Sequence, residues 1–184
     1  MSKERYFLES HLRWNELPQL RQSFENTQDN EEHLHITFVR PFSIDGDAQK
    51  VKEKIIEYCR GKKPIPFVLE GKGNFDENIS YIPVKSGELQ NFDNGLEKLL
   101  EGMVELDTKL NDEKILHLTV GSETKALSKT EMVMLRLTCI RNLKDGNGKR
   151  IWFSYDFVTQ EVLSREETRD FDRWQKTQKL YTQE

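Results

Sequence analysis

The sequence has little cysteine, no long apolar run and no large excess of charge of either sign. Its two cysteines, Cys59 and Cys139, are far apart and in no metal-binding or redox spacing, which favours a reduced, cytoplasmic protein. No apolar run approaches the roughly 20 residues that a membrane helix needs, and the first residues lack the apolar stretch of a signal peptide. We therefore expect a soluble, cytoplasmic protein with no membrane partner.

The balance of acidic and basic residues limits the kinds of ligand that the protein can bind. Lys and Arg total 28 and Asp and Glu total 32, a formal charge of −4. This balance argues against binding along long DNA, which depends on many phosphate neutralisations, but it allows a nucleotide or short RNA in one basic cleft. The 184 residues suffice for one domain or two small lobes sharing a core. The sequence has no linker or low-complexity tract, so we expect one domain over residues 1–184, of which 165–184 form a charged C-terminal helix or tail. We also expect the protein to be a monomer.

Periodic apolar patterns predict an α+β fold with largely antiparallel sheets. Alternating patterns predict strands at residues 6–12, 33–42, 64–72, 79–84, 115–120, 134–143 and 150–158. Helical spacing predicts helices at residues 17–24, 47–61, 88–106 and 125–132. The Asp-Gly and Asn-Gly pairs in residues 144–149 predict a hairpin connection between the last two strands.

Two of the predicted strands carry the same short motif, His-x-Thr. Side chains alternate between the two faces of a strand, so His35 and Thr37 share one face while apolar residues occupy the other. The same alternation places His117 and Thr119 on one face of the second strand. Each strand is thus expected to bury an apolar face and to present a histidine and a threonine on the opposite face.

These residue types suit the cleavage of a phosphodiester. One group must take a proton from the attacking water or hydroxyl, and another must protonate the leaving oxygen. Histidine, whose unperturbed pKa is about 6.5, can do either near neutral pH. Threonine hydroxyls two residues further on can donate hydrogen bonds to the phosphate oxygens as charge develops. Such a site requires neither a metal nor another cofactor, and the sequence shows no convincing carboxylate cluster at metal-ligand spacing.

Residues 33–39 (HLHITFV), with residues 117–120 (HLTV) about 80 positions later, resemble the 2H phosphoesterase superfamily, and most of all its LigT-like group of 2′-5′ RNA ligases and 2′,3′-cyclic phosphodiesterases. The resemblance covers nearly the whole chain. It implies a bilobed α+β fold with the motifs facing each other across a central cleft. It also implies that His35 and His117 are the catalytic acid/base pair, that Thr37 and Thr119 bind the phosphate, and that the substrate carries a 2′,3′-cyclic phosphate or a 2′-5′ linkage.

The flanks of the motifs differ from the usual family pattern. The first motif continues into Arg40-Pro41 where the family usually has Leu-Gly, and the second into Gly121-Ser122 where a basic residue often follows. These differences leave the substrate open. A hydrolase that acts on cyclic nucleotides or RNA ends is the interpretation we favour, with 2′-5′ RNA ligation as its chemical reverse.

Three alternatives stay open from the sequence. His33, His35 and His117 can chelate a metal in principle, since imidazoles two apart on a strand point the same way, but this leaves the repeated threonine unexplained. A second alternative is a binding module for nucleotides or RNA ends that has lost turnover. The third is a structural or regulatory domain in which the two motifs coincide by chance.

Base recognition and further phosphate contacts have several candidates and no assignment. The cations near the motifs or in the later strands are Arg40, Lys125, Arg136 and Arg141. The aromatic side chains that can stack on a base are Tyr6, Phe42, Phe75, Tyr81 and Trp152. Strand aromatics usually belong to the core, and surface cations are usually solvated, so no individual residue is selected.

Overall fold

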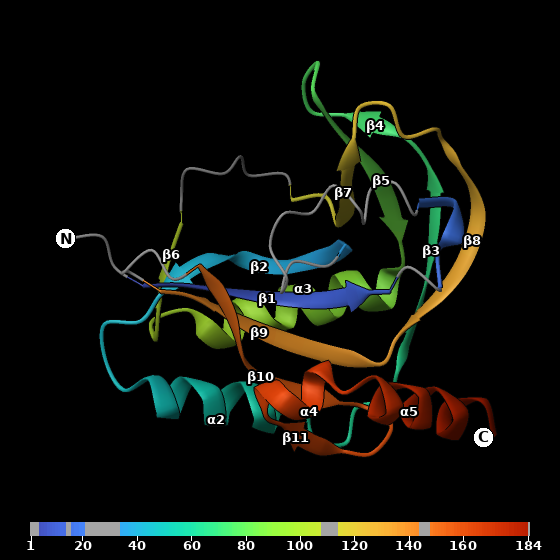
Figure 1. The fold of residues 1–184 in the computed structure, drawn as a ribbon. Coiled ribbons are helices and arrows are strands. Elements are labelled where there is room, and N and C mark those ends of the chain that lie inside the picture. The colour runs from blue at the N-terminus through green and yellow to red at the C-terminus, as the bar shows by residue number, and fades with distance from the viewer. Residues whose placement is uncertain (1–3, 14–15, 21–33, 108–113, 144–147, 184) are drawn as a thin grey trace.

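The structure, a computed structural model, describes residues 4–13, 16–20, 34–107, 114–143 and 148–183. Its strands pair antiparallel and helices pack against them (Figure 1), so the α+β expectation is confirmed. The strands are β1 (Arg5–Leu12), β2 (Leu34–Ser43), β3 (Ile65–Gly71), β4 (Gly73–Asn74), β5 (Ile79–Lys85), β6 (Glu105–Leu106), β7 (His117–Gly121), β8 (Leu127–Met134), β9 (Arg136–Asn142), β10 (Lys149–Asp156) and β11 (Glu161–Leu163). The helices are the 3-10 helix η1 (Pro18–Leu20), α2 (Ala48–Cys59), α3 (Gly87–Leu100), α4 (Arg165–Arg169) and α5 (Phe171–Gln183).

The strands follow the order β11-β10-β9-β1-β2-β7-β5-β3-β8, with β4 beside β5 and β6 beside β2. Figure 1 shows two groups of strands at an angle to each other, one from β11 to β2 and one from β7 to β8. They meet where β2 pairs with β7, and the paired position is Ile36 with Leu118. The bilobed arrangement expected from the sequence is therefore present, and the two His-x-Thr strands form its junction.

The alternation in β2 and β7 follows the sequence pattern. In β2 the apolar side chains of Leu34, Ile36 and Phe38 are buried, and Phe38 packs edge-on against Phe92 of α3. In β7 and just before it, the buried apolar side chains are Leu116, Leu118 and Val120. Burying one face of each strand against the core fixes the register. The polar face is then free to form a site.

Helices α2 and α3 begin at side-chain caps, and α3 ends earlier than the sequence predicted. Asp47 caps α2 and Ser86 caps α3, each accepting hydrogen bonds from backbone N–H groups of the first turn. The predicted helix over 88–106 stops at Leu100. Gly102 follows with a φ of 76°, a conformation that glycine adopts at little cost and that ends a helix.

The predicted helix over 125–132 is wrong. Those residues fall largely in β8, which pairs with β3 from Ile65–Met134 to Gly71–Leu127. Polar and charged residues fill much of this segment, so its periodicity is weak, and the pairing partner decides its conformation. Of the predicted helix over 17–24, residues 18–20 form η1, and residues 21–24 lie outside the described residues, as do 144–147 of the predicted hairpin connection.

The C-terminal region is helical, as α4 and α5, and Trp174 and Thr177 of α5 are buried against the sheet. Figure 1 places both helices beside β9 and β10, near the end of β1. None of the helices that the structure describes combines the length and the apolar character needed to span a membrane.

Candidate active site

The pairing of β2 with β7 brings the two sequence motifs together. Because the strands run antiparallel with Ile36 opposite Leu118, the flanking positions place His35 beside Thr119 and Thr37 beside His117. The four side chains lie on the face opposite the buried apolar residues. The positive charge of His35 acts on the pKa of His117, as expected for two histidines on one surface.

A cavity of about 570 Å³ opens over this face. Its lining includes both histidines and Thr37, but Thr119 is exposed and does not line it. The lining residues are Phe7, Glu9, His35, Thr37, Val39, Arg40, Pro41, Phe75, Ile79, Lys114, Ile115, His117 and Lys149. Both groups of strands therefore contribute to one cavity, as expected for a cleft between two lobes.

His117 is held in a form that can accept a proton. Its Nδ1 lies 2.6 Å from the carbonyl oxygen of Ile115. Because a carbonyl only accepts, Nδ1 carries the hydrogen and Nε2 keeps a lone pair. Burial lowers the pKa of His117, and the hydrogen bond to Ile115 opposes this effect. The charges of His35 and Lys114 lower the pKa further, so the net pKa lies below its ordinary value.

Glu9 is a buried carboxylate next to His35. Its Oε1 lies 3.5 Å from His35 Nε2, and its Oε2 lies 3.0 Å from His11 Nε2. Burial raises the pKa of Glu9, but the hydrogen bond from His11 and the charges of His35 and His11 outweigh it, so the net pKa is lowered. An ionised carboxylate thus lies beside the imidazole of His35. Sequence reasoning missed Glu9, because only the pairing of β1 with β2 brings it beside His35.

Three cations line the cavity, and only one was considered from the sequence. Arg40 lies 2.6 Å from Glu97, and Lys114 Nζ lies 2.6 Å from Asp93 Oδ1. The third, Lys149, comes from β10. The carboxylate partners of Arg40 and Lys114 lie outside the lining, in which Glu9 is the one acidic residue among the described residues.

A strained backbone turn shapes one wall of the cavity. Val39 has a φ of 54°, which is unfavourable for a β-branched residue. Its backbone N–H donates to Asp93 Oδ1 over 2.6 Å, and the same oxygen accepts from Lys114. Asp93 is 1% exposed. One buried carboxylate on α3 therefore ties the bend in β2 to the segment that leads into β7.

The aromatic side chains considered for base stacking differ in burial and in their distance from the histidines. Tyr6 and Phe42 are buried and stack on each other, and Trp152 packs on Tyr6. Phe75 is 52% exposed, lines the cavity, and its ring centre lies 4.8 Å from that of His117. Tyr81 packs behind Phe75 at 4.4 Å. Phe75 is thus the aromatic side chain best placed to meet a ligand.

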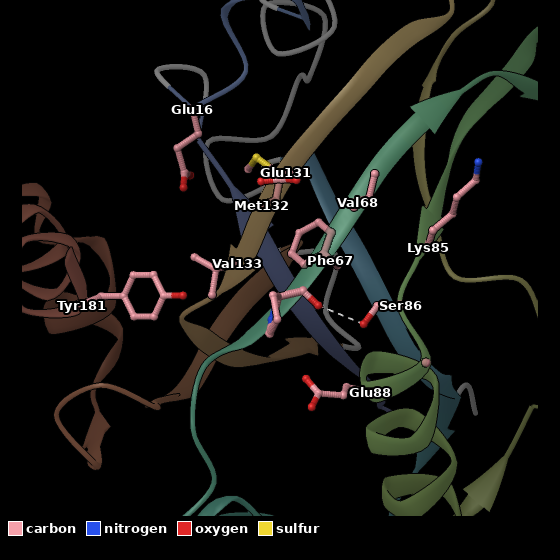
Figure 2. A pocket seen from close by; sticks show the side chains of 12 residues that line it. Glu16, Phe67, Val68, Lys85, Ser86, Glu88, Glu131, Met132, Val133 and Tyr181 are labelled. Atoms are coloured by element: carbon pink, nitrogen blue, oxygen red, sulfur yellow. Dashed lines mark hydrogen bonds between the residues drawn. The ribbon is translucent and has the colours of Figure 1, made fainter. Parts of the chain in front are cut away.

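Another hollow of the described residues lies away from the histidines and suits an anion poorly. It measures about 730 Å³ and lies between β3, β8 and the C-terminal helix, as Figure 2 shows. Glu16, Glu88 and Glu131 line it, against a single lysine, Lys85. That lysine also pairs with Glu70. None of the residues predicted for catalysis lies there.

The remaining predicted candidates fall outside the histidine cavity. Arg141 forms an ion pair with Glu4, and Arg136 is buried and pairs with Asp156. Lys125 is exposed and does not line the cavity. His33, a member of the considered three-histidine metal site, lies outside the described residues. Among the residues that are described, no three His, Cys, Asp or Glu side chains group as potential metal ligands.

An antiparallel α+β fold in which two His-x-Thr strands pair and both histidines line one cavity is typical of a two-histidine phosphoesterase. The chain belongs to the 2′-5′ RNA ligase superfamily, whose family model matches residues 10–145. The crystal structure of TT0787 of Thermus thermophilus has a similar fold, with a TM-score of 0.51 at 12% identity over 88% of this chain and 97% of that chain. No curated protein matches the chain.

Proposed function

We propose that the protein is a metal-independent phosphodiesterase that hydrolyses 2′,3′-cyclic phosphates of nucleotides or RNA ends, and 2′-5′ linkages, through His35 and His117. The observation that carries this proposal is that both histidines and Thr37 line one cavity. Nucleotides or short RNAs are the proposed substrates, and the protein is proposed to act as a cytoplasmic monomer without a cofactor.

The two histidines have different surroundings, and these surroundings support different proposed roles. His117 Nε2 has a free lone pair and takes a proton from water, whose oxygen then attacks phosphorus. His35, held beside the Glu9 carboxylate, gives its proton to the ribose oxygen as the P–O bond breaks. The product is a phosphomonoester with a free ribose hydroxyl. With an RNA 5′-hydroxyl in place of water as the nucleophile, the same pair would open the cyclic phosphate to a 2′-5′ linkage and a free 3′-hydroxyl, which is 2′-5′ ligation.

Charge on the phosphate is stabilised by the groups around it. The Thr37 hydroxyl can donate a hydrogen bond to a non-bridging oxygen, and Lys114 adds a positive charge from the β7 side of the cavity. We keep Thr119 as a second proposed phosphate contact. Its exposed position beside the His35 strand allows it to meet a substrate larger than a single phosphate.

The deciding experiment is turnover in excess chelator. The purified protein is assayed with 2′,3′-cyclic nucleotides and 2′-5′ dinucleotides, with 3′-5′ dinucleotides and a phosphomonoester as comparison substrates. Turnover of the first two classes that survives the chelator supports the proposal. Loss of activity in chelator would favour the alternative of a histidine metal site. Tight binding without turnover would favour the alternative of a non-catalytic binding module.

The pH profile of hydrolysis should show the lowered pKa of His117. A base with a lowered pKa keeps its neutral form at lower pH, so the acidic limb of kcat/KM is expected below the ordinary histidine value of about 6.5. Because burial is the largest cause, Phe75→Ala, which lets water reach the ring, should move that limb upward. A limb at or above 6.5 in the wild type, unmoved by Phe75→Ala, would contradict this assignment.

Phe75→Ala is also expected to weaken substrate binding. Stacking of a base on an aromatic ring contributes about 1–3 kcal/mol, so KM should rise roughly 5- to 150-fold for substrates with a base. The KM of a cyclic phosphate of ribose without a base should change little. Tyr155→Phe, at a buried position outside the cavity lining, is the control. Equal KM changes with and without the base would show that Phe75 does not stack on it.

A further inference from the structure

A second, smaller cavity lies on the same face of the sheet, between β1, β9 and the C-terminal helices. It measures about 210 Å³ and shares no lining residue with the His35–His117 cavity. Its described lining residues include no carboxylate, and they are His11, Arg13, Arg136, Thr138, Ile151, Thr168, Arg169 and Trp174. Three arginines surround this small space, and Asp156, the acidic partner of Arg136, lies outside the lining.

Two buried N–H donors in this cavity have no partner among the described residues. They are Nη1 of Arg136 and Nε1 of Trp174, and each of these side chains is 5% exposed. Buried donors of this kind are rare, because leaving them without an acceptor costs free energy. Arg136 uses its other nitrogens to reach Asp156 and Thr177, so it is held rigidly with Nη1 left over.

Arg13 and Arg136 both lie against the indole of Trp174. The guanidinium carbons are 5.1 and 4.9 Å from the ring centre. Burial lowers the pKa of Arg13, and the nearby charge of Arg136 lowers it further. Two guanidinium groups thus repel each other beside donors that need an acceptor. An anion in the cavity relieves both.

We propose that this cavity is a binding site for one phosphate group, separate from the catalytic cavity. Phosphate matches the donors because its oxygens accept several N–H bonds at once, and arginine is the residue best suited to hold it. His11 links the two cavities, since it lines this one and is hydrogen-bonded to Glu9, the neighbour of His35.

The phosphate group can come from two sources. One is a further phosphate of an RNA substrate whose reacting phosphate lies between His35 and His117, and this source rests on the proposed function. The other is free inorganic phosphate. Binding itself depends on neither catalysis nor turnover, so it can be tested if the proposed function fails.

The test follows the indole N–H signal of Trp174 by nuclear magnetic resonance during titration with sodium phosphate, against sodium chloride at equal ionic strength. Trp174→Phe assigns the signal. A saturable shift with phosphate alone is expected. Arg13→Gln should weaken binding about tenfold or more, and Arg169→Gln, at an exposed position, serves if the first variant does not fold. Arg150→Gln removes the same charge from an exposed site on β10 outside the cavity and should leave binding unchanged.

No saturable shift, or equal weakening by Arg13→Gln and Arg150→Gln, overturns the proposal. The source is then separated with two cyclic phosphates. If the RNA supplies the group, Arg13→Gln raises KM about tenfold for a dinucleotide 2′,3′-cyclic phosphate and leaves the mononucleotide unaffected. If free phosphate is the ligand, the KM ratio of the two substrates stays constant.

Discussion

Replacing His117 by alanine is expected to lower kcat for 2′,3′-cyclic nucleotides about a thousandfold, with KM within a few-fold of the wild type. General acid–base catalysis contributes about 10²–10⁴-fold, and the His117 lone pair acts on the attacking water rather than on bound substrate. His35→Ala should cost a similar factor. Because the two act in one step, the double variant is expected to be about as slow as either single variant.

Initial-rate kinetics and single-turnover measurements check this result. Lys125→Ala, at an exposed position outside the cavity, is the control and should keep wild-type kcat. Thermal melting confirms that the histidine variants are folded. A single histidine variant that keeps more than a tenth of wild-type kcat would contradict the acid–base roles.

Asp93→Ala is expected to lower the free energy of unfolding by about 3 kcal/mol. The substitution removes the acceptor of the Val39 N–H and the partner of Lys114 Nζ, both 2.6 Å away. It also leaves Val39, with its φ of 54°, without the bond that holds it. Burial lowers the pKa of Lys114 and Asp93 opposes this, so the lysine should lose its proton more easily in the variant.

Urea unfolding of the wild type and two matched variants measures the loss. Asp93→Asn can still accept from Val39 but carries no charge, so its loss should be smaller than that of Asp93→Ala. Asn94→Ala, the exposed neighbour on the same helix, should stay within about 0.5 kcal/mol of the wild type. A loss below about 1 kcal/mol for Asp93→Ala would show that the carboxylate does not hold the bend.

The two motif strands could be predicted because the pattern that identifies them lies within each short segment of sequence. Alternation with a period of two marks the buried face of Ile36 and Leu118, and the histidines follow on the other face. The segment around Lys129 failed as a helix because it has no strong period, and its strand conformation depends on pairing with β3. The end of the helix at Leu100 also depended on one glycine, Gly102.

The surroundings of the histidines were not predictable from local patterns. Glu9 lies beside His35 only because β1 pairs with β2, and the sequence separates these residues by a long interval. Lys149 lines the cavity from the start of β10, and Lys114 lines it from the segment before β7. Asp93 is indistinguishable from a solvated helix carboxylate until the bend at Val39 is known. Sheet order, which no short motif encodes, assembles these side chains.

The junction of the two strand groups has a consequence for the spacing of the histidines. Among the described residues, β1 and β2 share six paired positions and β5 and β7 share five, whereas β2 and β7 share one. His35 is therefore held mainly by the strands from β11 to β2, and His117 by the strands from β7 to β8. The distance between the two imidazoles depends on how these two groups of strands pack, so we expect that a substitution in the core of either group, such as one at Ile82 or Leu8, alters turnover without contacting the substrate.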